Sequence, residues 1–296
     1  MKKSLLILLA ALFAFTGGQP GFAKKKKSLR APEIKLKVEL DRKVLPAGKT
    51  ERAVLKVSLQ PDQVVLEEAH RPPVNLALVL DRSGSMSGEK IEQAKEAAIQ
   101  AIRRLGAKDI VSIIAYSNHA ETIASAQSAK NTEKLVGLVR QLKANGGTAL
   151  FAGVNQGAAE LRKNLDEEYF NRIILLSDGL ANQGPSSTED LVRLGRALVK
   201  EDISVSTVGL GSGYNEDLMA GLAREGQGNL YFAETSKELP GIFDAEIGDA
   251  LNVVARHATL RIELETGVRP IRLIGRQGVI RENNVEIEIN QLYGGQ

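Results

Sequence analysis

Residues 76–88, LALVLDRSGSMSG, consist of an apolar run followed by a polar loop. This pattern is the starting point for predicting the fold of the surrounding chain. Residues 76–80 are continuously apolar, which is typical of a parallel strand that is covered on both faces. Similar apolar or β-branched runs occur at residues 110–114, 173–176 and 205–208. Helical patterns separate these runs, so the sequence predicts an α/β fold with a doubly wound, mainly parallel sheet and helices on both faces.

The segments between these strands have the apolar spacing and the boundary residues of helices. The first helical stripe stops at Gly106, and a later helix is predicted to open with Ser187 as its N-cap. Asn215 is expected to cap another helix, which stops at Gly226. The last predicted helix presents a core-facing stripe of Phe243, Ile247, Leu251 and Val254.

The flanking strands follow a different pattern. Apolar and polar residues alternate at residues 35–40 and 55–59, and again at 260–264 and 285–289, so each strand has one buried and one solvated face. Because the ends of an inserted domain usually lie close together, we expect both chain ends to form one small β-sandwich around the inserted α/β domain.

These patterns predict the domain boundaries. The chain ends just after a strand, with the turn-like Tyr293-Gly294-Gly295-Gln296, and we interpret it as a fragment of a longer protein. The predicted segments are a leader (1–23), a basic linker (24–32), N-terminal strands (33–72), the α/β domain (73–254) and C-terminal strands (255–296).

The first 23 residues have the composition of a secretory signal peptide. Lys2 and Lys3 precede an apolar stretch of 11 residues at 5–15, and Gly21 and Ala23 place small residues before the expected cleavage point. A membrane span needs about 18 or more apolar residues, so a retained anchor is the less favoured alternative. We therefore expect a periplasmic or secreted protein after cleavage near Ala23.

Composition and charge restrict the class of protein. The chain has 296 residues, 43% of them apolar and 4% aromatic, and no cysteine, which is typical of a globular fold without disulfides. The net charge of +3 comes from basic residues near the start, including Lys24, Lys25, Lys26 and Lys27. This run is expected to be a solvated linker or a contact with a membrane surface, and nucleic acid is not expected as a partner.

Oxygen-bearing side chains follow two of the predicted strands. Asp81, Ser83 and Ser85 alternate along the loop after residues 76–80, and Asp178 follows the strand that ends near residue 176. Thr148 precedes a predicted helix. Because the carboxyl ends of parallel strands open on one edge, these side chains can surround one ion. Hard oxygen donors suit Mg²⁺, with Mn²⁺ or Ca²⁺ as alternatives, and the three scattered histidines match no zinc spacing.

The Asp-x-Ser-x-Ser loop, the Gly146-Gly147-Thr148 segment and Ser177-Asp178-Gly179 resemble the metal-ion-dependent adhesion site of von Willebrand factor type A domains. Residues 203–232 also resemble the later half of exported bacterial members, including those similar to inter-alpha-trypsin inhibitor heavy chains. The resemblance covers roughly residues 73–245. It implies that Ser83 and Ser85 bind the cation through their hydroxyls, with Asp81 and Asp178 binding directly or through water and Thr148 binding directly when a ligand is engaged.

The resemblance also implies the function. A partner protein would place an Asp or Glu carboxylate in the open coordination position, which is binding rather than enzyme chemistry. Two alternatives stay open: a Mg²⁺-dependent phosphohydrolase with Asp81 as nucleophile, although Ser83 stands where its general acid is expected, and a structural subunit of an envelope assembly.

Other residues near these motifs are expected to have ordinary roles. We interpret Arg82 and Met86 as exposed loop and helix-start residues without a role in the site. Asn118 and His119 fit a polar hairpin turn, with contact to a ligand as the alternative. Residues 209–213 hint at a phosphate loop, but Tyr214 replaces the glycine of a dinucleotide-binding fingerprint, so a turn is predicted.

Overall fold

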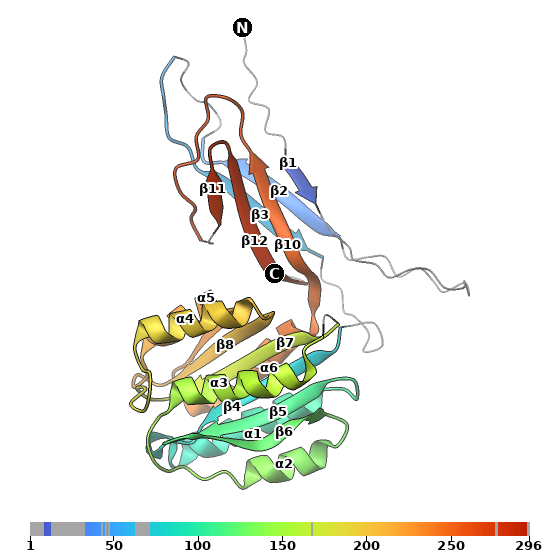
Figure 1. Ribbon diagram of the computed structural model, residues 1–296, viewed down its shortest axis with the longest axis vertical. Coiled ribbons are helices and arrows are strands. Elements are labelled where there is room, and N and C mark those ends of the chain that lie inside the picture. The colour runs from blue at the N-terminus through green and yellow to red at the C-terminus, as the bar shows by residue number, and fades with distance from the viewer. Residues whose placement is uncertain are drawn as a thin grey trace, which may run out of the picture. The chain divides into compact units, whose positions relative to one another are not determined.

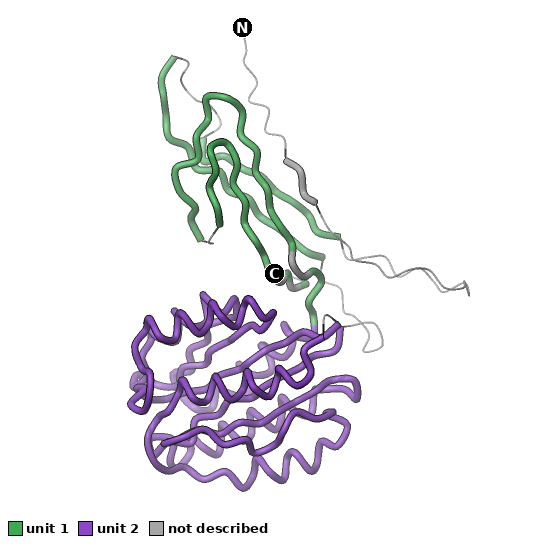
Figure 2. The backbone as a smooth tube through the Cα atoms, viewed as in Figure 1, with its two compact units in different colours: residues 1–66, 252–296 green, residues 67–251 purple. Residues whose placement is uncertain are grey.

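The computed structural model of the chain describes residues 9–12, 33–42, 44, 46, 48–62, 72–166, 168–275 and 278–294. The chain divides into two compact units, of which unit 2 comprises residues 67–251 and unit 1 comprises both chain ends, residues 1–66 and 252–296 (Figure 2). The predicted cleavage site and the lysines at 24–27 lie outside the described residues. Of the predicted leader, only the backbone of β1 (Leu9–Leu12) is described.

Unit 2 is built on a six-stranded sheet with the order β6-β5-β4-β7-β8-β9 (Figure 1). All neighbouring pairs are parallel except β5 and β6, which form an antiparallel hairpin at one edge. The expected fold class is therefore confirmed. The strands are β4 (Val74–Asp81), β5 (Ile110–Tyr116), β6 (Ala120–Ser128), β7 (Phe170–Ser177), β8 (Ile203–Leu210) and β9 (Gln227–Ala233).

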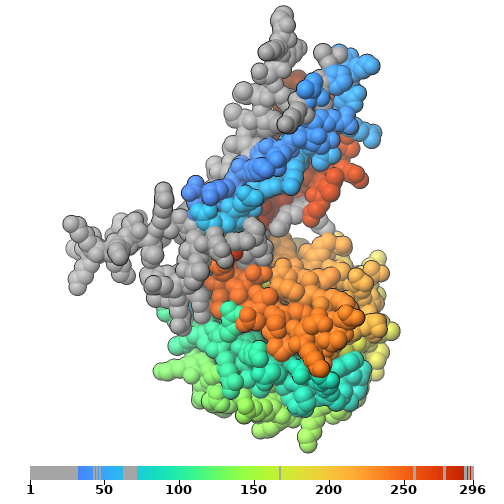
Figure 3. Space-filling model, turned by 180° about the vertical axis from the view of Figure 1, so that it is seen from behind, coloured from blue at the N-terminus to red at the C-terminus, as the bar shows by residue number. Residues whose placement is uncertain are grey.

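Helices cover both faces of this sheet. On one face, α3 contacts β4, β5 and β7, while α4 and α5 contact β8. On the other face α1 and α6 pack together, and their surfaces lie side by side in Figure 3, α1 in teal and α6 in orange. The helices are α1 (Glu89–Arg104), α2 (Thr132–Arg140), α3 (Leu150–Leu161), α4 (Thr188–Val199), α5 (Glu216–Glu225) and α6 (Leu239–Leu251), with short 3₁₀ turns η1 (Gly84–Met86), η2 (Arg162–Asn164) and η3 (Ser236–Glu238).

Two of the predicted caps are present. The Ser187 side chain accepts a hydrogen bond from the Asp190 amide at the start of α4, and Asn215 accepts one from the Leu218 amide at the start of α5. Such caps satisfy amides that lack a partner within the helix. Of the stripe expected on the last helix, Phe243 and Ile247 are fully buried. Leu251 is only partly buried, and Val254 lies in β10 (Val253–Glu263), beyond the end of α6, so the predicted helix was too long.

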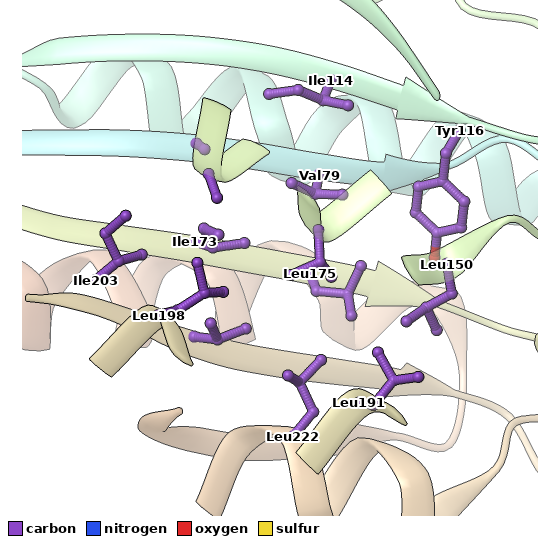
Figure 4. Packing of buried hydrophobic residues seen from close by; sticks show 14 of the residues in the cluster. Val79, Ile114, Tyr116, Leu150, Ile173, Leu175, Leu191, Leu198, Ile203 and Leu222 are labelled. Atoms are coloured by element: carbon purple, nitrogen blue, oxygen red, sulfur yellow. The ribbon is translucent and has the colours of Figure 1, made fainter. Parts of the chain in front are cut away.

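A core of buried apolar side chains lies between the sheet and the face covered by α3, α4 and α5 (Figure 4). Val79, Ile173 and Leu175 of the strands belong to one buried cluster with Leu150 and Leu222 of the helices. Burying each such side chain contributes about 1.5–3 kcal/mol.

Small residues bring α3 close to the sheet. A Cβ on Gly153 would lie 2.8 Å from the Tyr116 ring, and one on Gly157 would lie 2.8 Å from Val79. Glycine therefore allows α3 to lie directly over β4 and β5, and this close packing places the segment before α3 beside the end of β4.

Unit 1 contains two antiparallel sheets. The hairpin of β2 (Ile34–Leu40) and β3 (Leu55–Pro61) forms one sheet. The other has the order β1-β10-β12-β11, with β10 (Val253–Glu263), β11 (Val279–Arg281) and β12 (Asn284–Tyr293). Apolar residues of β2 and β3 pack against a buried cluster on the second sheet, consisting of Ala258, Leu260, Ile262, Val285, Ile289 and Leu292. The β-sandwich made from both chain ends is therefore present.

The strand that precedes the turn-like end of the chain has neighbours on both edges. β12 pairs with β10 on one side and with β11 on the other. The short strand β11 was not predicted from the sequence. No helix in the described ranges combines the length and the apolar character that a membrane crossing requires.

Candidate metal centre

The polar side chains singled out from the sequence lie at the carboxyl edge of the sheet in unit 2. Asp81 is the last residue of β4, and Asp178 directly follows β7, the parallel neighbour of β4. Ser83 and Ser85 lie at η1, and Thr148 lies two residues before α3. Ends of adjacent parallel strands and the loops after them form the usual ligand site of such sheets.

Asp81 is fully buried and both its carboxylate oxygens accept hydrogen bonds. The Ser83 amide donates to Oδ1 at 2.7 Å. The Ser177 hydroxyl donates to Oδ2 at 2.9 Å, and the Tyr116 hydroxyl approaches the same oxygen at 3.4 Å. Burial raises the pKa of Asp81 and the nearby charge of Asp178 raises it further, whereas the hydrogen bonds from Ser83 and Ser177 lower it.

Ser85 links the first loop to Asp178. Its hydroxyl donates to Asp178 Oδ1 at 2.6 Å and lies 3.0 Å from the Ser83 hydroxyl. The second oxygen of Asp178, Oδ2, accepts a hydrogen bond from Lys90 Nζ at 2.5 Å. Ser83 and Asp178 are buried, whereas Ser85 is exposed, so the site opens to solvent on the Ser85 side.

Thr148 faces the same space from a third loop. A Cβ placed on Gly179 would lie 3.5 Å from the Ser85 hydroxyl oxygen and 3.7 Å from that of Thr148. Both hydroxyls therefore border one small volume beside Gly179. The structure thus brings together Asp81, Ser83, Ser85, Thr148 and Asp178.

Hydrogen bonds tie the three loops to one another. The Gly84 amide donates to the Gly146 carbonyl at 2.9 Å, which connects the first loop with the second. Asn182 Oδ1 accepts from the Thr148 amide at 2.9 Å and connects the second loop with the third. Asn118 Oδ1 accepts from the Gly147 amide at 2.7 Å. These hydrogen bonds hold the three loops together at the carboxyl edge of the sheet.

Two expectations for this region are wrong. Arg82 is not an idle exposed residue, because its guanidinium donates to Asn145 at 3.0 Å and to Glu121 at 3.1 Å and is largely covered. Met86 is fully buried rather than exposed, because η1 turns its side chain into the core. A loop residue with an apolar side chain can become a core residue once the loop folds back over the sheet.

Several residues that support the site were not assigned to it from the sequence. Lys90, Tyr116, Ser177 and Asn182 all contact one of the site residues or its backbone. Asn118 occupies the expected hairpin turn between β5 and β6, and its side chain also holds the Gly147 amide. Of these supporting residues, only Ser177 could have been assigned to the site from the sequence, because it directly precedes Asp178.

The donor set fits a hard divalent cation. It consists of two carboxylates and three hydroxyls, and oxygen donors of this kind suit Mg²⁺, Mn²⁺ and Ca²⁺. Beside Gly179, a Cβ would contact two of these hydroxyls, so they face a common space that a cation can enter. In the part of the chain that the structure describes, no group of three or more His, Cys, Asp or Glu side chains forms a metal site.

Comparison with known proteins gives a family match and several sequence relatives. Residues 75–245, more than half of the chain, match the von Willebrand factor type A domain family. An uncharacterized protein of Synechocystis sp. is 34% identical over 194 residues, covering 66% of this chain and 46% of that protein. Inter-alpha-trypsin inhibitor heavy chain H3 of Homo sapiens is 27% identical over 164 residues, covering 53% of this chain and 18% of that protein. The chain thus spans less than half the length of these relatives.

Solved structures share the fold. A von Willebrand factor type A protein from Catenulispora acidiphila superposes with a TM-score of 0.72 at 18% identity, covering 92% of this chain and 65% of that one. Proximal thread matrix protein 1 of the mussel byssus, solved with a zinc-occupied adhesion-site motif, has a TM-score of 0.51 at 19% identity and covers 60% of this chain and 45% of that one.

Domains of this family typically bind a divalent metal at the adhesion site and commonly mediate protein–protein interactions. The match in sequence extends over unit 2 from β4 to the middle of α6, and the fold of that unit agrees with it. The chain therefore belongs to the von Willebrand factor type A domain family.

Proposed function

We propose that this protein is a divalent-cation-dependent protein-binding module. Asp81, Ser83, Ser85, Thr148 and Asp178 hold Mg²⁺, with Mn²⁺ or Ca²⁺ as alternatives, and a partner protein supplies an Asp or Glu carboxylate to the remaining position. The observation that carries the proposal is that the Ser85 and Thr148 hydroxyls border the same space beside Gly179, while hydrogen bonds link Ser85 to Ser83 and Asp178, and Ser83 to Asp81.

The charges at the site support a cation. Two aspartates lie close enough to interact, and both are buried at 3% exposure or less. Buried carboxylates need positive charge or hydrogen bonds to stay ionised, and a divalent ion supplies positive charge to both. When bound, the ion would also polarise a partner's carboxylate and hold it at the exposed Ser85 side.

The geometry of Asp81 counts against the phosphohydrolase alternative. A nucleophilic carboxylate must reach the phosphorus of a substrate, but Asp81 is fully buried and its two oxygens are hydrogen-bonded to the chain. Asp81 instead orients the Ser83 loop through the Ser83 amide. We therefore favour binding over catalysis.

Isothermal titration calorimetry of the full chain with Mg²⁺ and Mn²⁺ tests the metal site. Asp178→Asn and Thr148→Val, both close in size to the native residues, are expected to weaken binding by about tenfold or more. Ser87→Ala is the matched control, because the Ser87 hydroxyl lies in the same loop but donates only to the Gly84 carbonyl. Unchanged affinity in both site variants would refute the assignment.

A second experiment tests the partner chemistry. Peptides that contain one glutamate should bind the Mg²⁺-loaded protein more tightly than matched glutamine peptides, and EDTA should abolish the difference. Equal binding of the two peptides with and without EDTA would contradict the role of a carboxylate. Export is tested separately by fractionating cells that express the full chain, with cleavage near Ala23 as the expected result.

A further inference from the structure

Lys90 is the second residue of α1 and contacts the proposed metal centre directly. Its ammonium group lies 2.5 Å from Asp178 Oδ2, while the other oxygen of Asp178 accepts from Ser85. The Asp178 side chain is fully buried, whereas that of Lys90 is 39% exposed. Among the described residues, Lys90 is the only one that forms an ion pair with either aspartate of the site.

The position of Lys90 is unfavourable for the helix alone. The first turn of α1 has free amides and a partial positive charge, so acidic residues are preferred there, and Glu89 and Glu92 follow this preference. A lysine between them opposes the helix dipole. The contact with Asp178 is the interaction that offsets this cost.

The net charge of the two aspartates and Lys90 is negative without an ion and becomes positive when a divalent cation is added. The two carboxylates of Asp81 and Asp178 contribute two negative charges when both are ionised, of which Lys90 balances one. A divalent cation balances both aspartates by itself, so Lys90 then adds a surplus positive charge next to the ion. Two positive charges that share one carboxylate in a partly buried site repel one another strongly.

We propose that Lys90 is the resident counter-ion of Asp178 and competes with the divalent cation for this carboxylate. The inference rests on the proposed metal site and adds a residue that regulates its affinity. The flexible, partly exposed lysine side chain holds the site together without metal and swings into solvent when the ion binds. Lys90 is thus a positioning residue: it orients the Asp178 carboxylate through the ion pair and lowers the affinity of the site for metal.

The experiment is a Mn²⁺ titration of the full chain, followed by calorimetry, for the wild type and Lys90→Met. Removal of the competing charge is expected to tighten Mn²⁺ binding by about tenfold, because one neighbouring charge shifts a carboxylate equilibrium by about one to three powers of ten. In EDTA the variant should melt at a lower temperature than the wild type, since the ion pair between Lys90 and Asp178 is lost. Saturating Mn²⁺ should therefore raise its Tm by more than it raises that of the wild type.

Two further variants make the result specific. Lys237→Met removes an exposed lysine that pairs with Glu89, next to Lys90, at 3.9 Å, and it should leave Mn²⁺ affinity within about twofold of the wild type. Lys90→Gln removes the charge but keeps a hydrogen-bond donor, and should behave as Lys90→Met does. A general loss of structure would weaken metal binding, so tighter binding separates competition from damage.

The failure of this inference differs from the failure of the proposed function. If the wild type binds Mn²⁺ and the Lys90 variants bind it equally or more weakly, the role of Lys90 is refuted while the metal centre stands. Wild-type protein that binds no Mn²⁺ would overturn the metal centre and this inference with it.

Discussion

Gly179 offers a way to fill the proposed cation site without disturbing the fold. Its backbone lies outside the left-handed region, so alanine can adopt the same conformation. The new methyl group would lie 3.5 Å from the Ser85 hydroxyl oxygen and 3.7 Å from that of Thr148, which are ordinary van der Waals distances. Gly179→Ala should therefore fold normally.

The expected magnitudes differ between stability and binding. Alanine restricts the unfolded chain, so the free energy of unfolding should stay within about 1 kcal/mol of the wild type or rise slightly. Mg²⁺ binds oxygen at about 2.0–2.1 Å and keeps several waters, so a methyl group between two of its ligands removes space for them. Metal affinity is expected to fall by about tenfold or more.

Urea unfolding and Mg²⁺ calorimetry measure the two quantities on the same samples. Gly137→Ala is the matched control, because Gly137 lies within α2 and a Cβ there has no atom within 4 Å. That variant should gain up to about 1 kcal/mol and keep its metal affinity. A Gly179→Ala protein that is folded and binds Mg²⁺ as the wild type does would refute the proposed position of the ion.

Three other outcomes are expected. Glu246→Gln should lower the free energy of unfolding by about 3–5 kcal/mol in urea unfolding, because it removes the negative charge that pairs with the buried guanidinium of Arg172, and a double variant with methionine at both positions should be more stable than this single variant. A hydrogen bond from Arg196 lowers the pKa of the Glu225 carboxyl, so its contribution to stability is present above the unfolded pKa near 4.5 and is lost as the pH falls through the lower folded value. Urea unfolding at pH 6 and pH 3.5 should therefore differ less for Glu225→Gln than for the wild type, and an equal difference would contradict this. Thr148→Ser keeps the hydroxyl and should retain Mg²⁺ binding within about threefold, whereas Thr148→Val should weaken it by about tenfold or more; equal affinities would exclude a direct role for the hydroxyl.

Local patterns in the sequence were sufficient to predict those strands and helix caps that depend only on neighbouring residues. Continuous apolar runs predicted β4, β5, β7 and β8, since a strand covered on both faces has no polar side. The caps Ser187 and Asn215 were predictable because a cap bonds to an amide three residues away. The edge strand β6, with mixed polar and small residues, has no such pattern and was not delimited.

The supporting contacts of the site could not be predicted in the same way. Lys90 and Asp178 are 88 positions apart, and Asn182 reaches the Thr148 amide across 34 positions. Met86 was misassigned because its burial depends on where η1 folds back over the sheet. None of these relations leaves a trace in the spacing of residues along the chain.

By itself, the sequence determined the alternation of strands and helices, the class of fold and the oxygen-bearing residues at the strand ends, because periodicity and residue chemistry are local properties. Only the tertiary structure decided which polar groups meet. Strand order and the close approach of α3 bring the Ser85 and Thr148 hydroxyls to one space beside Gly179, and the start of α1 places a lysine on Asp178. Such contacts depend on packing between distant segments, and packing is the part of folding that a local pattern does not encode.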